Sequence, residues 1–305
     1  MDRDFSYLRA DQAFLDPDRA DANTPGEAKC VVIPFGLEHS VSYGNGTARG
    51  PVAILEASHQ LELFDDETWR CPCDEFGIAT LDVGDIDVSR GLVSALEHIE
   101  GLVEGVLAAG RFPFVLGGEH ALSAGAIRPF ARRHDKLVVL QIDAHADLRD
   151  GYLGEHYSHA SAMRRALDHD NVSVVGVGIR AFCEEEANFY LANRDRITLF
   201  FGKDQADWDI EKICEPLKGQ SVYVTFDIDG LDQGVMPATG TPTPGGLDYL
   251  QALKILRRAS EVCDIVGADL VELAPIPNFH SCDFLAAQLA YKIMGYALSV
   301  KPALR

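Results

Sequence analysis

Apolar, largely β-branched runs recur along the chain and are separated by stretches with helical spacing. Six of these runs predict β-strands: Cys30–Pro34, Pro113–Leu116, Leu137–Ile142, Val172–Val177, Ser221–Phe226 and Ile265–Leu273. Each run is almost continuously hydrophobic, which is typical of strands that are buried on both faces of a sheet.

Between the strands, apolar residues three and four positions apart predict amphipathic helices. The clearest stripe, which Gly110 is expected to close, consists of Leu92, Leu96, Ile99, Val103 and Val106. A second helix is predicted to begin at Pro51, because proline suits the first helical turn. Its apolar residues would be Ile54, Leu55 and Leu61. A C-terminal helix is predicted over Phe284–Met294.

Strands that alternate with helices predict an α/β fold in which a mainly parallel sheet is covered by helices on both faces. We expect a single domain over residues 1–305, with an N-terminal extension at 1–28, because the chain shows no repeat, low-complexity tract or charged linker. Pro237–Gly246 is rich in proline and glycine and predicts a turn-rich loop.

Composition narrows the class of protein. The formal net charge of −20 argues against nucleic-acid binding and favours approach of cationic small molecules. Seven scattered cysteines without a CxxC pair predict thiols and a reducing compartment. The charged N-terminus does not resemble a signal peptide, and no apolar run is long enough to span a bilayer, so we expect a cytoplasmic protein.

Polar residues gather directly after three of the predicted strands. In a parallel sheet, ligands collect at the carboxyl ends of strands, so these residues are expected to meet. In an extended segment, alternate side chains point the same way, which would let the Asp143-Ala144-His145-Ala146-Asp147 motif converge on one point. The candidate ligands are His120, Asp143, His145, Asp147, Asp227 and Asp229.

These ligand types predict a site for two metal ions. One aspartate pair after a strand is more often a turn or a helix cap, but three such clusters are harder to explain that way. Mutual repulsion and desolvation would make the buried carboxylates costly without cations. Carboxylate and imidazole ligands without a thiolate favour Mn²⁺, or a similar borderline-hard ion, over structural zinc at these two positions.

Two close cations can polarise one water and so provide a nucleophile near neutral pH. His159 could then transfer a proton to the leaving group, and His156 is the competing choice on the same loop. Glu272 comes directly after the apolar residues Ile265–Val271 of the last predicted strand. It could bind a planar guanidinium by paired hydrogen bonds. An ordinary salt bridge at the strand end explains Glu272 equally well.

Five motifs give the chain a resemblance to the ureohydrolase family, which includes arginases, agmatinases and formiminoglutamases. In order, they are GGEH at 117–120, DAHAD at 143–147, SHAS at 158–161, TFDIDGLD at 225–232 and VELAP at 271–275. The similarity extends from about Val31 to Gly295, and the agmatinase branch looks closest.

The resemblance implies ligand sets and roles. One Mn²⁺ would be held by His120, Asp143, Asp147 and Asp227, and the other by Asp143, His145, Asp227 and Asp229. His159 would be the proton-shuttling histidine and Glu272 the guanidinium-binding carboxylate. Glu119, where aspartate is more frequent, is not expected to be a ligand. The family fold is a three-layer α/β/α sandwich, which commonly forms trimers or hexamers.

The implied reaction is hydrolysis of agmatine to putrescine and urea, a step of polyamine biosynthesis. Aminopropylagmatine, guanidinobutyrate and arginine are alternative substrates, although Leu148-Arg149-Asp150 lacks the asparagine that arginases place there for an α-carboxylate. Glu184, Glu185 and Glu186 are candidates for an acidic rim that binds a cationic tail. More distant alternatives are a metal-dependent deacetylase of the same architecture and a metal-binding protein without turnover.

Overall fold

The computed structural model describes residues 5–86 and 88–299, and its centre is one parallel β-sheet. Eight strands lie in the order β2-β1-β3-β8-β7-β4-β5-β6, and every neighbouring pair is parallel. Their bounds are β1 Cys30–Phe35, β2 Ile78–Thr80, β3 Phe112–Gly117, β4 Leu137–Ile142, β5 Val172–Ile179, β6 Ile197–Phe201, β7 Ser221–Asp227 and β8 Asp264–Val271.

All six predicted strands are present, as β1, β3, β4, β5, β7 and β8. The predicted end of the last strand at Leu273 was wrong, because β8 ends at Val271 and Glu272 leaves the strand with a φ of 66°. The sequence did not predict β2 and β6, which are the two edge strands. β2 has only three residues and so lacks a long apolar run, whereas β6 has the apolar sequence ITLFF and was overlooked.

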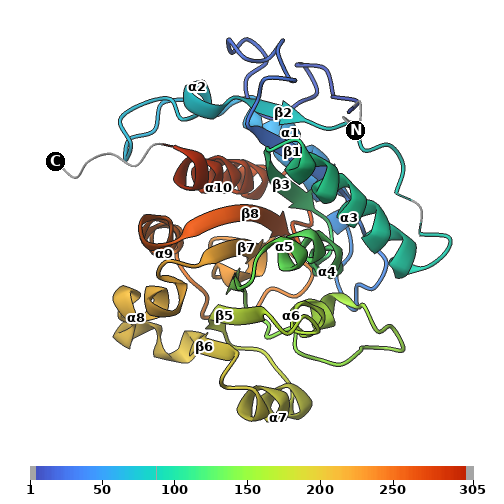
Figure 1. Ribbon diagram of the computed structural model, residues 1–305, viewed down its shortest axis with the longest axis vertical. Helices are drawn as coiled ribbons and strands as arrows, with labels where there is room; N and C mark the ends of the chain where they lie inside the picture. Colours follow the sequence, from blue (N-terminus) through green and yellow to red (C-terminus); the bar gives the residue numbers. More distant parts are fainter. Residues whose placement is uncertain (1–4, 87, 300–305) are drawn as a thin grey trace.

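Helices cover both faces of the sheet, which gives the expected three-layer α/β/α sandwich (Figure 1). The α-helices are α1 Gly50–Ser58, α2 Cys73–Phe76, α3 Leu92–Ala108, α4 Ser123–Ala126, α5 Arg128–Arg133, α6 Ala162–Ala166, α7 Glu184–Ala192, α8 Ile210–Cys214, α9 Tyr249–Val262 and α10 Ser281–Leu298. Apolar residues of α1, α8, α9 and α10 pack on one face, and those of α3, α5 and α6 on the other. Short 3-10 helices follow several strands at their carboxyl ends.

The three predicted helices correspond to α3, α1 and α10. All five stripe residues of α3 are buried, and Gly110 adopts the left-handed conformation just past the helix end, with a φ of 70°. Pro51 lies in the first turn of α1, as expected. Leu61 is buried but lies outside α1, which ends at Ser58, so its assignment to that helix was wrong.

The N-terminal extension packs against the β2 edge of the sheet. Phe14 and Leu15 are fully buried there. Their backbone N–H groups donate to the hydroxyls of Thr80 and Ser58, at 2.9 Å and 2.7 Å. This segment therefore covers an edge strand whose backbone would otherwise be exposed. None of the helices within the described residues is long and apolar enough to cross a membrane.

Candidate metal centre

Four adjacent strands carry the predicted site residues at their carboxyl ends. In the sheet order β3-β8-β7-β4, His120 follows β3, Glu272 follows β8, Asp229 follows β7 and Asp143 follows β4. The parallel arrangement brings these ends to one edge of the sheet. All six candidate ligands lie together in the structure, as the sequence predicted.

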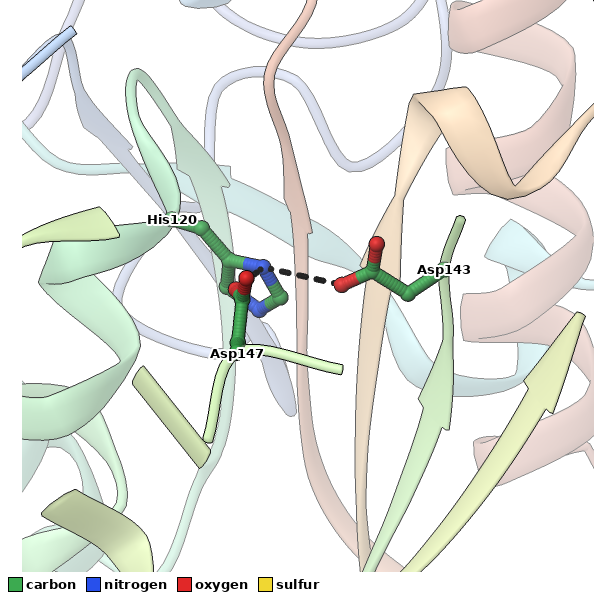
Figure 2. Close-up of side chains that lie close together, drawn as sticks. All are labelled: His120, Asp143 and Asp147. Carbon is green, nitrogen blue, oxygen red and sulfur yellow. Dashed lines mark ion pairs between the residues drawn. The ribbon is translucent and has the colours of Figure 1, made fainter. Parts of the chain in front are cut away.

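The first group of side chains surrounds the imidazole of His120. Its Nδ1 atom lies 3.3 Å from Asp143 Oδ2, 3.0 Å from Asp147 Oδ2 and 3.4 Å from Asp227 Oδ2. Figure 2 shows His120 and Asp147 side by side, with the carboxylate of Asp143 pointing toward them from the end of β4. All four side chains are buried, and donor atoms of His120, Asp143 and Asp147 are close enough together to hold one metal ion.

The second group is built around His145. Its Nδ1 atom lies 3.0 Å from Asp229 Oδ2 and 3.7 Å from Asp143 Oδ1. Donor atoms of these three residues could hold a second ion. Asp143 belongs to both groups and offers a different oxygen to each, so the two groups adjoin. This arrangement fits a pair of divalent cations that share one carboxylate.

Asp147 reaches the first group by a turned backbone. The sequence argument expected an extended segment from Asp143 to Asp147, and this was wrong, because β4 ends at Ile142 and Asp147 has a φ of 52°. Aspartate tolerates the left-handed conformation better than most residues. The convergence of the three side chains was therefore predicted correctly, but for a reason that applies only in part.

A chain of hydrogen bonds orients His120 for metal binding. Its Nε2 lies 2.8 Å from the Thr225 hydroxyl, which donates to the buried carboxylate of Asp269 at 2.6 Å. The only hydrogen of the Thr225 hydroxyl is donated to Asp269. The Thr225 oxygen must therefore accept a hydrogen from Nε2–H of His120. In the neutral imidazole, Nδ1 then carries the lone pair, and it lies buried among the carboxylates of Asp143, Asp147 and Asp227. A cation between Nδ1 and these carboxylates would satisfy both, so the donor set fits a metal ion.

Replacing Thr225 with valine should weaken Mn²⁺ binding at the His120 group by about 10- to 100-fold, because the imidazole loses the partner that fixes its tautomer. Competition with a chelator would measure the affinity. Thr80→Val is the matched control, since Thr80 is also buried in a strand but lies at the far edge of the sheet. Equal affinities in the two variants would contradict the proposed role of Thr225.

Burial and crowding give this cluster unusual proton affinities. Burial, with help from Asp147 and Asp229, raises the pKa of Asp143 to about 7. Burial lowers the pKa of His145, but its contact with Asp229 outweighs this effect and the pKa rises to about 10. Protons on these groups can compensate part of the negative charge, and bound cations would take their place.

Glu272 is held rigidly beside the first group. Its Oε1 accepts the backbone N–H of His120 at 2.7 Å, and its own N–H donates to Gly118 O at 2.8 Å. Its positive φ is unusual for a glutamate, and such backbone strain tends to occur at functional sites. Burial raises the pKa of the Glu272 carboxyl to about 8. The Gly118 position has no room for a side chain, because a Cβ there would lie 1.9 Å from Leu37 O.

The two histidines of the loop after β4 point to different places. His159 begins a 3-10 helix, His159–Ser161, and lines the pocket in front of the metal groups. His156 does not line that pocket; its Nδ1 lies 2.8 Å from the guanidinium of Arg165, and its ring packs on Tyr157. The geometry therefore favours His159 as the proton-transfer residue over His156.

The pocket has a volume of about 300 Å³ and carries both polar and aromatic groups. Its inner wall contains His120, His145, Asp147, Asp227, Asp229 and Glu272. Toward the mouth lie Tyr43, which is 86% exposed, and Phe182, which is 44% exposed. Of the three glutamates proposed as an acidic rim, Glu186 lines the pocket, and Glu184 and Glu185 do not.

Comparison with known proteins places these features in a family. The sequence model described as "Arginase family" matches residues 28–295. The chain belongs to the arginase family. It is 38% identical over 278 residues to an N(1)-aminopropylagmatine ureohydrolase of Synechocystis sp., with 88% of this chain and 89% of the relative covered. It is 35% identical over 253 residues to an agmatinase of Bacillus anthracis, with 82% and 85% covered.

Solved structures of the arginase family agree with the observed fold. The agmatine ureohydrolase of Thermoplasma volcanium superimposes with a TM-score of 0.80 at 29% identity, with 91% of this chain and 92% of that chain covered. The resemblance drawn from the five motifs and the arginase-like fold are thereby confirmed. The chain is a hydrolase of this family, so the alternatives of a deacetylase and of a metal-binding protein without turnover lose their support.

Some residues of this arginase-family site were missed by sequence reasoning. Ser40 contacts His159, and Glu119 contacts Ser40, although the sequence gave Glu119 no role. Arg149 lines the pocket, stacks over the ring of Tyr152 and lies 3.7 Å from Glu186. Only the position of Glu119 beside His120 could have drawn attention to it. The other contacts join segments far apart in the chain and leave no local pattern.

Proposed function

We propose that this chain hydrolyses a guanidino-amine with a cationic tail and releases urea, with two Mn²⁺ ions as cofactors. The observation that carries the proposal is the pair of histidine–carboxylate groups that share Asp143 and face a pocket with a buried glutamate, Glu272. N1-aminopropylagmatine is the first candidate substrate, because relatives with that activity in their names reach 38% identity. Agmatine, which the sequence analysis ranked first, is the second candidate.

The proposed reaction consumes one water and leaves the total charge unchanged. The oxygen of water forms a bond to the guanidinium carbon, and the bond from that carbon to the alkylated nitrogen breaks. The products are urea and an alkylammonium ion, whose nitrogen gains both protons of the water. A bound pair of divalent cations supplies activation of that water and stabilisation of the charge that develops in the transition state.

The residues of the chain have distinct tasks in this proposal. The six ligands would hold the cations, with Asp143 between them. Glu272 would accept hydrogen bonds from the guanidinium and so direct its carbon toward the metal groups. His159 would move a proton to the leaving nitrogen, since its side chain is in the pocket and imidazole can take up and release protons near neutral pH.

The mouth of the pocket favours a cationic tail over an anionic one. The rings of Tyr43 and Phe182 line it and can attract an ammonium group through their faces. The one arginine of the lining, Arg149, is stacked on Tyr152 and paired with Glu186, so its charge is largely compensated. The net charge of −20 adds long-range attraction for a polycation.

Urea release from a substrate panel tests the proposal. With Mn²⁺-loaded protein, kcat/KM should be highest for aminopropylagmatine, lower for agmatine and lowest for guanidinobutyrate and arginine, which carry carboxylates. A preference for guanidinobutyrate would contradict the cationic-tail argument. Failure of every guanidine to release urea would overturn the proposed reaction as a whole.

His159→Asn should lower kcat by about 100-fold, because general acid–base catalysis contributes roughly 10²–10⁴ to rates. The amide nitrogen of asparagine can replace Nδ1 in its contact with Ser40, so this variant removes mainly Nε2. His156→Asn is the matched control on the same loop. Metal content should stay unchanged in both variants, and a larger loss of kcat in the His156 variant would reverse the assignment.

Three further properties follow as proposals from the same reasoning. The carboxylate and imidazole ligands favour Mn²⁺ over Zn²⁺, which a comparison of reconstituted metals would test. We also propose a cytoplasmic location, which suits seven cysteines that form no disulfide among the described residues. A homo-oligomer, trimeric or hexameric, is expected from the resemblance, and analytical ultracentrifugation would measure it.

A further inference from the structure

Glu119 is an entirely buried carboxylate that accepts hydrogen bonds from a segment far away in the sequence. Its Oε2 accepts the backbone N–H groups of His39, at 2.8 Å, and Ser40, at 2.7 Å. Its Oε1 accepts the hydroxyl of Ser40 at 3.0 Å. Both oxygens of the carboxylate are therefore committed to residues 39 and 40, and Glu119 fixes the position of the Ser40 side chain.

The Ser40 hydroxyl has two further contacts, and both are with His159. Its oxygen accepts the backbone N–H of His159 at 3.0 Å and lies 3.1 Å from the Nδ1 atom of the ring. A hydroxyl has one hydrogen and two lone pairs. Since the hydrogen is directed to the Glu119 carboxylate, the lone pairs are left for His159, and Nδ1 must be the donor in the ring contact.

The opposite assignment leaves an unfavourable contact. If Ser40 donated its hydrogen to Nδ1, the hydroxyl oxygen and Glu119 Oε1 would lie 3.0 Å apart without a hydrogen between them. Two acceptors at that distance in a buried place are costly. With Nδ1–H as the donor, each of the contacts between Glu119, Ser40 and His159 pairs one donor with one acceptor.

We propose that Ser40, held by Glu119, is a positioning residue that fixes the Nδ1–H tautomer of His159 and so leaves Nε2 as the atom that exchanges protons in the pocket. Nε2 takes up one proton during attack of water and returns it to the leaving nitrogen as the carbon–nitrogen bond breaks. The Nδ1–H bond to Ser40 stays in place throughout. The catalytic consequence rests on the proposed function, whereas the tautomer itself does not.

Glu119→Gln gives the sharpest test, because it should invert the tautomer. The two backbone N–H groups of residues 39 and 40 would hold the amide oxygen of glutamine at the Oε2 position. The amide nitrogen would then donate to Ser40, whose hydroxyl would turn and donate to His159 Nδ1. His159 would carry its proton on Nε2, where it can no longer accept one. Orientation of a catalytic histidine by a carboxylate follows the same logic in serine proteases.

Two measurements on the full chain separate positioning from a merely structural role. Two-bond ¹H–¹⁵N spectra of histidine-labelled, Zn²⁺-loaded protein report the tautomer, with the His159 signals identified by their loss in His159→Asn. We expect Nδ1–H in the parent protein and Nε2–H in Glu119→Gln. With Mn²⁺, kcat of Glu119→Gln should fall about 10- to 100-fold with little change in KM or metal content.

The controls distinguish tautomer from packing. Ser40→Thr keeps the hydroxyl and should retain the Nδ1–H tautomer, whereas Ser40→Ala should lose it. Glu38→Gln is the matched control, because Glu38 anchors residues 46–48 of the same segment through one oxygen and does not contact His159. An Nε2–H tautomer in the parent, or an unchanged tautomer in Glu119→Gln, would overturn the inference. The tautomer is measured without substrate, so absence of urea release would overturn only the proposed function.

Discussion

Asp229→Asn should reduce urea release by about 1000-fold or more while the protein stays folded. The amide oxygen can still accept the backbone N–H of Ala144, and the amide nitrogen can donate to His145, so both contacts of Asp229 survive. What is lost is one negative ligand of the second ion. Lewis-acid stabilisation of the transition state is worth several kcal/mol, and about 4 kcal/mol correspond to roughly 10³ in rate.

Metal content and thermal unfolding complete this experiment. The variant should bind close to one Mn²⁺ per chain in place of two, and its metal-free form should unfold near the temperature of the parent. Asp248→Asn is the matched control, because Asp248 caps α9 away from the site and asparagine caps a helix equally well. Two tightly bound ions and undiminished turnover in Asp229→Asn would show that Asp229 is not a ligand.

Glu272→Gln is expected to lower kcat/KM for every guanidine to a similar extent. The amide oxygen of glutamine can still accept the backbone N–H of His120, so the local structure should persist. The charge that pairs with a guanidinium is lost, and removal of one partner of a buried charge pair costs about 2–5 kcal/mol. This corresponds to roughly 30- to 5000-fold in kcat/KM.

The substrate panel separates guanidinium binding from tail binding. A carboxylate that binds the common guanidinium group should affect agmatine, aminopropylagmatine and guanidinobutyrate alike, and metal content should not change. Glu185→Gln, outside the pocket, is the control. A loss restricted to substrates with a cationic tail would instead place Glu272 at the tail and contradict its proposed role.

The centre of the fold could be predicted because burial on both faces forces continuous apolar runs. This condition holds for β4 and β7, where every residue or nearly every residue is buried. It fails at the edge strand β2, which has only three residues, whereas the edge strand β6 is partly exposed but still apolar in sequence and was overlooked. The site followed from the same regularity, since polar residues directly after buried parallel strands must lie at one edge of the sheet.

The remaining features depend on contacts between distant segments or on backbone geometry. Asp147 and Glu272 adopt left-handed conformations, but neither is a glycine, so the sequence does not indicate a positive φ at these positions. Ser40 and Glu119 are 79 residues apart, and although Glu119 lies in the GGEH motif, nothing in that motif indicates a contact with Ser40. Glu186 looked like one of three equivalent surface glutamates, but it is buried because it caps its helix and binds the N–H of Leu148. Residues of this kind become visible only in three dimensions.

Anomalous diffraction from crystals of the Mn²⁺-loaded chain tests the central claim most directly. We expect two manganese peaks about 3.5–4 Å apart, as in other two-metal sites. One should lie beside His120 Nδ1 and the other beside His145 Nδ1, with Asp143 between them. A single peak, or manganese bound away from the carboxyl ends of β3, β7 and β4, would contradict the two-metal site on which the proposed reaction depends.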